Sequence, residues 1–257
     1  MKPLMVVACG GLLLVGCGGG QQSGGSQSEG GTPPPAPAAA PAGSGTITGS
    51  IKFTGTAPTN PPIDMSEEAA CKDKHPGGVT DPQVVVTNGN LANVFVYVKS
   101  GLPATATFTA PSEAVVIDQD GCLYHPRVLG IMVGQPLEIR NSDPVLHNIK
   151  AVPTANRGFN ISQPTQGMKT TRTFNTPEVM VPLECNVHGW MNAWVGVMSH
   201  PYFAVSGEDG SFTITGLPAG TYEIEAWHER LGTQTMSVTV TDGGSATADF
   251  TFAPKTI

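Results

Sequence analysis

The chain has 257 residues and carries 13 Lys and Arg against 20 Asp and Glu, which gives a formal net charge of −7 at pH 7. This acidic balance argues against nucleic acid as a ligand and favours encounter with a basic protein partner. From residue 45 onward the length suffices for one large or two small hydrophobic cores.

The first 16 residues carry one early charge, Lys2, followed by an apolar run. A run of this length is typical of a signal peptide and is too short for a permanent membrane-spanning helix. It ends in Leu14-Val15-Gly16-Cys17, which resembles the lipobox of bacterial lipoproteins. The resemblance implies removal of residues 1–16 and diacylation of Cys17, which would anchor the protein to a membrane of the bacterial cell envelope, facing the periplasm or the cell surface. The alternative is an ordinary secretory signal with an incidental Cys17.

Residues 17–44 are rich in Gly, Ser, Gln, Pro and Ala and include the stretch Pro33-Pro34-Pro35-Ala36-Pro37. Such a composition cannot bury enough apolar surface to fold. We therefore expect a disordered tether between the anchor and the folded portion.

Short alternating runs bounded by Gly, Pro, Asn and Asp recur through the rest of the chain, whereas helical periodicity is almost absent. Only residues 66–70 indicate a helical turn, with acidic residues near its start as the helix dipole favours. The chain is therefore predicted to be all-β, with strands over residues 46–53, 91–98, 128–132, 137–140, 193–198, 211–215, 221–227, 235–241 and 246–252.

Two stretches combine residues that bind transition metals. The predicted strand at 137–140 is followed by a turn and by His147-Asn148, and a later loop reads Cys185-Asn186-Val187-His188-Gly189-Trp190-Met191. Two imidazole nitrogens, a thiolate and a weak thioether form a ligand set that serves both Cu(I) and Cu(II). The arrangement resembles the cupredoxins, plastocyanin and its relatives, over residues 113–200, and the resemblance implies a Greek-key β-sandwich there.

Carried onto this sequence, the resemblance implies one copper ion per chain, with His147, Cys185 and His188 as equatorial ligands and Met191 as the axial ligand. It also implies that the backbone amide of Asn148 donates toward the cysteine sulfur, since such outer hydrogen bonds orient ligands and tune the potential. The edge of His188 is the predicted electron exit.

The loop departs from the plastocyanin pattern because only Gly189 and Trp190 separate His188 from Met191, which leaves the fourth ligand open. The same short spacing occurs in the binuclear copper centre of oxidase subunits, but that centre requires a second cysteine in the loop. A mononuclear site is therefore predicted. Taken singly, Cys185 reads as a buried thiol, His188 as a surface histidine and Met191 as core filler.

Besides Cys9 of the signal and the anchor cysteine, Cys71, Cys122 and Cys185 remain in a compartment that oxidises thiols. Because the number of these cysteines is odd, one of them stays outside any disulfide within the chain. The copper hypothesis requires a disulfide between Cys71 and Cys122, with Cys185 kept as a metal-bound thiolate. Spacing alone leaves open a disulfide through Cys185, which would abolish the site.

The stretch from Asp209 to His228 has Asp-Gly before one strand, Leu-Pro-Ala-Gly at a turn and Thr-Tyr at the start of the return strand. It resembles the carboxypeptidase regulatory-like domain, a transthyretin-type β-sandwich of the carbohydrate-binding-like fold group. Such domains usually open with a strand like residues 46–53. The resemblance implies a discontinuous sandwich from residues 45–112 and 201–257, with the cupredoxin domain inserted; the alternative is that residues 45–112 extend the cupredoxin.

These features predict a lipid-anchored copper protein that carries single electrons in the cell envelope to a redox partner such as a cytochrome. An enzyme is not predicted, because the sequence has no His-X-His pair for further copper and no evident nucleophile with its base or phosphate-binding loop. Two alternatives remain open. One is a copper carrier or sensor that does not cycle its metal, and the other is a surface module for glycan, whose aromatic candidates Tyr222 and Trp227 fit core packing better.

Overall fold

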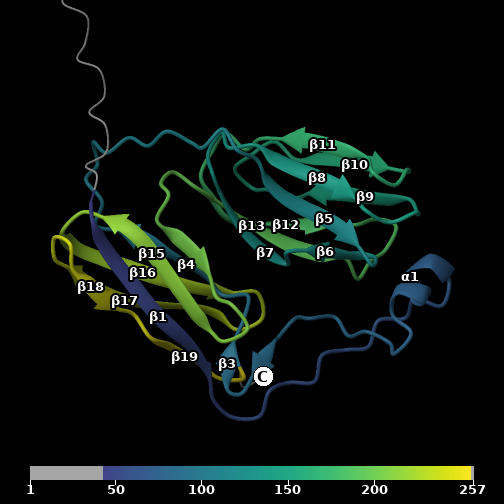
Figure 1. Ribbon diagram of the computed structural model, residues 1–257, viewed down its shortest axis with the longest axis horizontal. Coiled ribbons are helices and arrows are strands. Elements are labelled where there is room, and N and C mark those ends of the chain that lie inside the picture. Colours follow the sequence, from purple (N-terminus) through teal and green to yellow (C-terminus); the bar gives the residue numbers. More distant parts are fainter. Residues whose placement is uncertain (1–42, 256–257) are drawn as a thin grey trace, which may run out of the picture. The chain divides into compact units, whose positions relative to one another are not determined.

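The computed structural model describes residues 43–255, which form nineteen β-strands and one six-residue helix (Figure 1). The prediction of an all-β chain with β-sandwiches is confirmed. The predicted signal peptide, the predicted lipidation site Cys17 and all of the predicted tether except its last two residues lie outside the described residues. Within residues 43–255 no helix is both long and apolar enough to cross a bilayer.

One β-sandwich is built from strands near both ends of the described chain: β1 (Gly45–Phe53), β2 (Val86–Thr87), β3 (Asn90–Leu91), β4 (Phe95–Ser100), β14 (Phe203–Val205), β15 (Ser211–Leu217), β16 (Gly220–His228), β17 (Gly232–Val240), β18 (Ser245–Thr247) and β19 (Phe250–Phe252). Its first sheet has the order β15-β1-β3-β2, and β18 and β19 run parallel to β1. Its second sheet has the order β14-β4-β16-β17. Strands far apart in the sequence therefore share one core.

The alternation of apolar and polar residues determines which faces of these strands meet. In β1, Ile47, Ile51 and Phe53 are buried, and in its antiparallel partner β15 the side chains of Phe212 and Ile214 are buried between exposed neighbours. Because side chains two positions apart share a face of a strand, both strands turn one apolar face inward.

Three predicted elements differ from the structure. The predicted strand over residues 91–98 is divided into β3 and β4, which lie in different sheets, and Asn93 between them has a φ of +59°. The predicted strand over residues 246–252 is split into β18 and β19, because the Asp249 carboxylate between them accepts hydrogen bonds from the backbone amide (2.8 Å) and hydroxyl (2.9 Å) of Ser50. The helical turn predicted at residues 66–70 is displaced. Helix α1 (Ala69–Lys74) starts after an extended Glu68, so no acidic residue lies in its first turn.

The second β-sandwich comprises the strands between β4 and β14: β5 (Val115–Asp120), β6 (Leu123–His125), β7 (Val128–Met132), β8 (Leu137–Asn141), β9 (His147–Ala151), β10 (Phe159–Gln163), β11 (Lys169–Arg172), β12 (Glu178–Glu184) and β13 (Asn192–Met198). Its sheets have the orders β10-β9-β12-β13-β7 and β11-β8-β5-β6. The parallel pairs β13–β7 and β5–β8 require crossovers between the sheets. Ile117, Ile139, Ile149 and Leu183 are fully buried in the core between them.

Between β1 and β2 the chain makes a long excursion, residues 54–85, which carries α1 and which we call the strap (Figure 1). Cys71 of α1 forms a disulfide with Cys122 in the turn between β5 and β6, with a Cα–Cα distance of 5.5 Å. The strap is thus bonded covalently to the second sandwich. Among the described residues Cys185 is the free cysteine, and it is buried.

The two sandwiches meet at a compact apolar junction. Phe95 of β4 is fully buried there, and a Cβ added at Gly196 would lie 2.5 Å from its ring, so only glycine allows this approach. A buried ion network adjoins the junction, in which the Arg127 guanidinium binds Asp81 at 2.7 Å and Glu229 at 2.9 Å. Since a buried charge without its partner is costly, these groups hold the strap and both sandwiches in register.

His228, at the end of β16, is 1% exposed, and its Nδ1 accepts the backbone N–H of Arg230 at 3.2 Å. Burial lowers the pKa of His228 from 6.5, and the positive charge of Arg127 lowers it further, to about 4. Between these two values the unfolded chain binds a proton at this residue and the folded chain does not.

The stability of the protein should therefore fall as the pH drops from 7 to 4, and His228 alone should contribute about 3 kcal/mol of that loss. His228→Asn, which retains an acceptor near the Arg230 amide, should remove most of this contribution, whereas His125→Asn on the surface should leave it in place. Urea unfolding of the three proteins at both pH values measures the effect. An equal pH dependence for His228→Asn and the unsubstituted chain would contradict the assignment.

Candidate metal centre

The predicted ligands come from two segments at one end of the second sandwich. His147 is the first residue of β9, Cys185 directly follows β12, and His188 lies in the loop that leads into β13. Strands β9 and β12 are antiparallel neighbours, with Glu184 opposite Lys150. The start of β9 and the end of β12 therefore lie at the same end of the sheet, which brings the histidine and the cysteine together.

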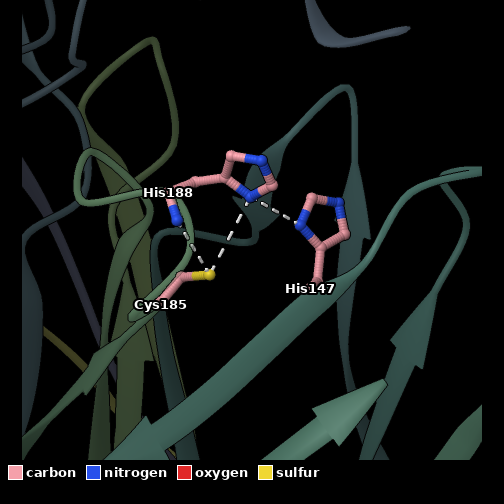
Figure 2. Close-up of side chains that lie close together, drawn as sticks. All are labelled: His147, Cys185 and His188. Atoms are coloured by element: carbon pink, nitrogen blue, oxygen red, sulfur yellow. Dashed lines mark hydrogen bonds between the residues drawn. The ribbon is translucent and has the colours of Figure 1, made fainter. Parts of the chain in front are cut away.

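The three side chains point toward one another (Figure 2). His147 Nδ1 lies 3.0 Å from His188 Nδ1, and Cys185 Sγ lies 3.9 Å from that same His188 nitrogen. One nitrogen from each ring and the sulfur all lie within 4.8 Å of one another, so the three could hold a metal ion. Two imidazole nitrogens and a thiol fit copper, because this mixed donor set accommodates both of its common oxidation states.

The surroundings of Cys185 favour the thiolate form of its side chain. Burial raises the pKa of the Cys185 thiol, but hydrogen bonds from the side chains of His147 and His188 and from the backbone amides of His188 and Asn148 outweigh it and lower the pKa to about 5. The His188 backbone N–H donates to the sulfur at 3.3 Å. Since the thiolate is the metal-binding form of cysteine, the site needs little proton release at neutral pH.

The opposite nitrogen of His147 is held by a buried carboxylate that sequence reasoning missed. His147 Nε2 lies 2.8 Å from Asp143 Oδ2. The Asp143 carboxylate also accepts the backbone N–H groups of Gly121 and Cys122, each at 2.8 Å. Burial raises the pKa of Asp143, but these hydrogen bonds and His147 lower it more, so the carboxylate stays ionised.

Such a carboxylate fixes the orientation of a metal-binding imidazole and increases its basicity. Burial lowers the pKa of His147, but Asp143 and Cys185 raise it by more. In the sequence, the role of Asp143 is indicated only by its position four residues before His147. The stretch Asn141-Ser142-Asp143-Pro144 is typical of an ordinary turn, so this carboxylate was not predicted to contact the site.

Asn148 ties the two metal-binding segments together. Besides its backbone amide near the sulfur, its side-chain oxygen accepts the backbone N–H of Asn186, and its amide nitrogen donates to Asn160. Residue 148 thus links β9 to the cysteine loop through both backbone and side chain, as an outer hydrogen-bonding group would.

Met191 closes the loop that contains Cys185 and His188. The Met191 backbone N–H donates to the His188 carbonyl at 2.9 Å, and the Cys185 backbone N–H donates to the Met191 carbonyl at 3.2 Å. Its side chain is buried in the same apolar core as Cys185. The role of Met191 as axial ligand stays a prediction.

The expectation that His188 presents an exposed edge is wrong. His188 is 4% exposed, because Cys71 Sγ of the strap lies 3.9 Å from its Nε2. On another side the ring of Trp190 packs against it, with centroids 5.1 Å apart. The indole Nε1 of Trp190 donates to the Cys122 carbonyl at 2.9 Å. The sequence could not reveal this covering, because the strap and the loop are far apart in the chain.

Comparisons with known proteins found matches to parts of the chain. Residues 193–253 match the family model of the carboxypeptidase regulatory-like domain, which confirms that resemblance for the carboxyl-terminal segment. No curated protein matches the chain.

Several solved structures are similar to part of the chain. The copper-containing nitrite reductase NirK from Thermus scotoductus SA-01 is 20% identical over 39% of this chain, which spans only 26% of that enzyme, with a TM-score of 0.31. A purple cupredoxin from Nitrosopumilus maritimus is 23% identical over 33% of this chain and 99% of its own, with a TM-score of 0.29. The Cu(I) form of a single-site mutant of amicyanin is 19% identical over 40% of this chain and 98% of its own, with a TM-score of 0.30.

Replacement of the carboxylate behind His147 should weaken metal binding. We expect Asp143→Asn to lower the affinity for Cu(II) by about 10- to 100-fold, because the amide cannot hold the imidazole with the same charge. Asp118→Asn is the matched control, since Asp118 accepts the Ser142 hydroxyl at 2.7 Å and does not contact a candidate ligand. Titration against a competing chelator measures both affinities. Equal affinities would show that Asp143 has a purely structural role.

Proposed function

We propose that the protein is a mononuclear copper protein that carries single electrons. The observation that carries the proposal is the convergence of His147, Cys185 and His188 at one buried point, with ligand atoms within 4.8 Å of one another. Bound copper would supply one-electron chemistry in a ligand set that suits both of its oxidation states. The residues of the chain must position the donor atoms and limit the access of water.

The chain holds its donor atoms by contacts that do not depend on a metal. Asp143 orients His147, and the backbone amides of His188 and Asn148 are directed at the Cys185 sulfur. Ligands fixed in this way change little in position when the charge at the site changes, and that favours repeated electron exchange. Their burial also limits the access of water and of small molecules, which favours a carrier over a site that binds a substrate.

The glycan-binding alternative receives little support from the first sandwich. Tyr222 is buried and its hydroxyl donates to the Pro218 carbonyl at 2.7 Å, while the ring of Trp227 packs against Trp194 with centroids 5.2 Å apart. Both aromatic residues therefore contribute to packing, whereas sugar stacking needs an open aromatic face.

We further propose that the carrier works in the bacterial cell envelope, anchored through lipid on Cys17 and extended from the membrane by residues 17–44. The lipobox-like sequence and the composition of the tether support this. The formal net charge of −7 favours encounter with a basic redox protein, such as a cytochrome, over encounter with an acidic one.

Addition of Cu(II) to the purified protein should produce an intense visible band from charge transfer between the Cys185 thiolate and the metal. Cys185→Ser should abolish the band, because a hydroxyl does not provide the soft, charged donor, and His125→Asn on the surface should leave it unchanged. Absorption spectroscopy provides the measurement. A colourless oxidised protein would refute the electron carrier, and colourless binding of Cu(I) alone would instead favour a non-redox carrier or sensor.

Met191→Leu tests the fourth ligand. If the thioether binds the metal, its removal should shift the visible band and raise the reduction potential, because the more highly charged oxidation state loses a donor. Met132→Leu, at a buried methionine of the same sandwich, should change neither quantity. Spectroelectrochemical titration of both variants measures the band and the potential. An unshifted Met191→Leu protein would reduce Met191 to a packing residue.

A further inference from the structure

The strap covers the Nε2 edge of the His188 ring. Cys71, in α1, is fully buried and places its sulfur 3.9 Å from His188 Nε2. This nitrogen lies on the opposite side of the ring from Nδ1, which faces Cys185 and His147. Because the strap occupies the outer edge of the imidazole, a partner protein cannot contact that edge directly.

Helix α1 and the residue after it contact three consecutive residues where β5 turns into β6: Asp120, Gly121 and Cys122. Besides the disulfide to Cys122, Lys74 Nζ lies 2.7 Å from Asp120 Oδ1 and 3.6 Å from Asp143 Oδ1. His75 Nε2 lies 2.7 Å from the carbonyl of the intervening residue, Gly121. Exposed ion pairs contribute little on their own, so the disulfide is the dominant fastening.

Gly121 is required for this close contact. Its φ is +62°, and a Cβ at this position would lie 3.0 Å from His75 Nε2. Both the backbone conformation and the lack of space favour glycine. The turn is thus shaped to receive the strap.

Trp190 provides a different route from His188 to the surface. Its ring packs against the imidazole with centroids 5.1 Å apart, and its Nε1 is fixed by the Cys122 carbonyl. Trp190 is half-buried and lines a surface hollow of about 360 Å³, together with Tyr124 and Asn192. One side of this indole therefore touches a candidate ligand while another side borders a hollow that solvent can enter.

We propose that the strap seals the His188 edge and that Trp190 is the contact through which the metal site exchanges electrons with its redox partner. This inference rests on the proposed function. In each exchange one electron leaves the reduced metal and reduces the partner, and no bond or proton is transferred. Electron tunnelling weakens steeply with distance, so the accessible side chain nearest to a ligand dominates the rate.

Closure of the strap is tested without metal. In the full, metal-free chain, Cys185 should react slowly with iodoacetamide, and the modified peptide is quantified by mass spectrometry. Cys71→Ser/Cys122→Ser should increase that rate by about tenfold, equivalent to about 1.4 kcal/mol. Cys71→Ala/Cys122→Ala, which also removes the disulfide but leaves small apolar side chains at these buried positions, provides a second opened form should the first variant not fold. Equally fast modification in the unsubstituted chain and in a folded opened variant would overturn the seal.

The electron route is tested with the copper-loaded full chain and a small cationic oxidant, tris(phenanthroline)cobalt(III). Trp190→Leu should slow oxidation of the reduced protein by about tenfold, or about 1.4 kcal/mol in activation free energy, with the visible band and the potential unchanged. Trp190→Phe, which keeps a ring beside His188, should restore most of the rate. Trp194→Leu is the matched control and should react at the original rate, because Trp194 packs on Trp227 and not on a candidate ligand.

Opening the strap in the Trp190→Leu chain should restore fast oxidation, since the His188 edge then becomes accessible. An unchanged rate in Trp190→Leu, with the strap closed, would overturn the route while leaving the electron carrier intact. Absence of the visible band in the unsubstituted protein would instead refute the proposed function itself. The two failures are therefore distinguishable.

Discussion

The Asp143 carboxylate is the interaction on which the rest of the site depends. It is 1% exposed, and its oxygens contact the imidazole of His147, the backbone amides of Gly121 and Cys122, and at longer range the ammonium of Lys74. A buried charge is tolerated only when it is satisfied by such partners. One ionised group therefore sets the orientation of a candidate ligand and the shape of the turn that receives the strap.

This shared carboxylate links the metal site to the strap. The turn that it holds includes Cys122, which is bonded to Cys71 beside His188. The carbonyl of Cys122 also accepts the indole N–H of Trp190. A displacement of Asp143 would thus act on both candidate histidine ligands, on one directly and on the other through the turn. The arrangement favours a rigid site, because each outer group has more than one partner.

The strand pattern and the loop that holds Cys185 and His188 could be predicted because both depend on local sequence. The short apolar run over residues 128–132 predicts β7 with its observed bounds, and the spacing from Cys185 to His188 places two donors in one loop. Contacts between distant segments that belong to no sequence motif could not be predicted. Asp249 interrupts a predicted strand through Ser50, and Cys71 reaches His188 only because the strap crosses to the other sandwich. Such contacts leave no periodic signal in the sequence.

The low pKa of Cys185 also makes its sulfur chemically reactive. A thiolate at neutral pH is the reactive form in thiol–disulfide exchange, and the proposed cell-envelope location would expose it to other disulfides. The pKa of about 5 therefore favours metal binding and unwanted oxidation alike. Burial of the sulfur at 4% exposure limits the second reaction, because an attacking or attacked sulfur must approach in line. The disulfide that fastens the strap is itself buried, so two of the three cysteines among residues 43–255 are bonded to each other and Cys185 remains for a metal.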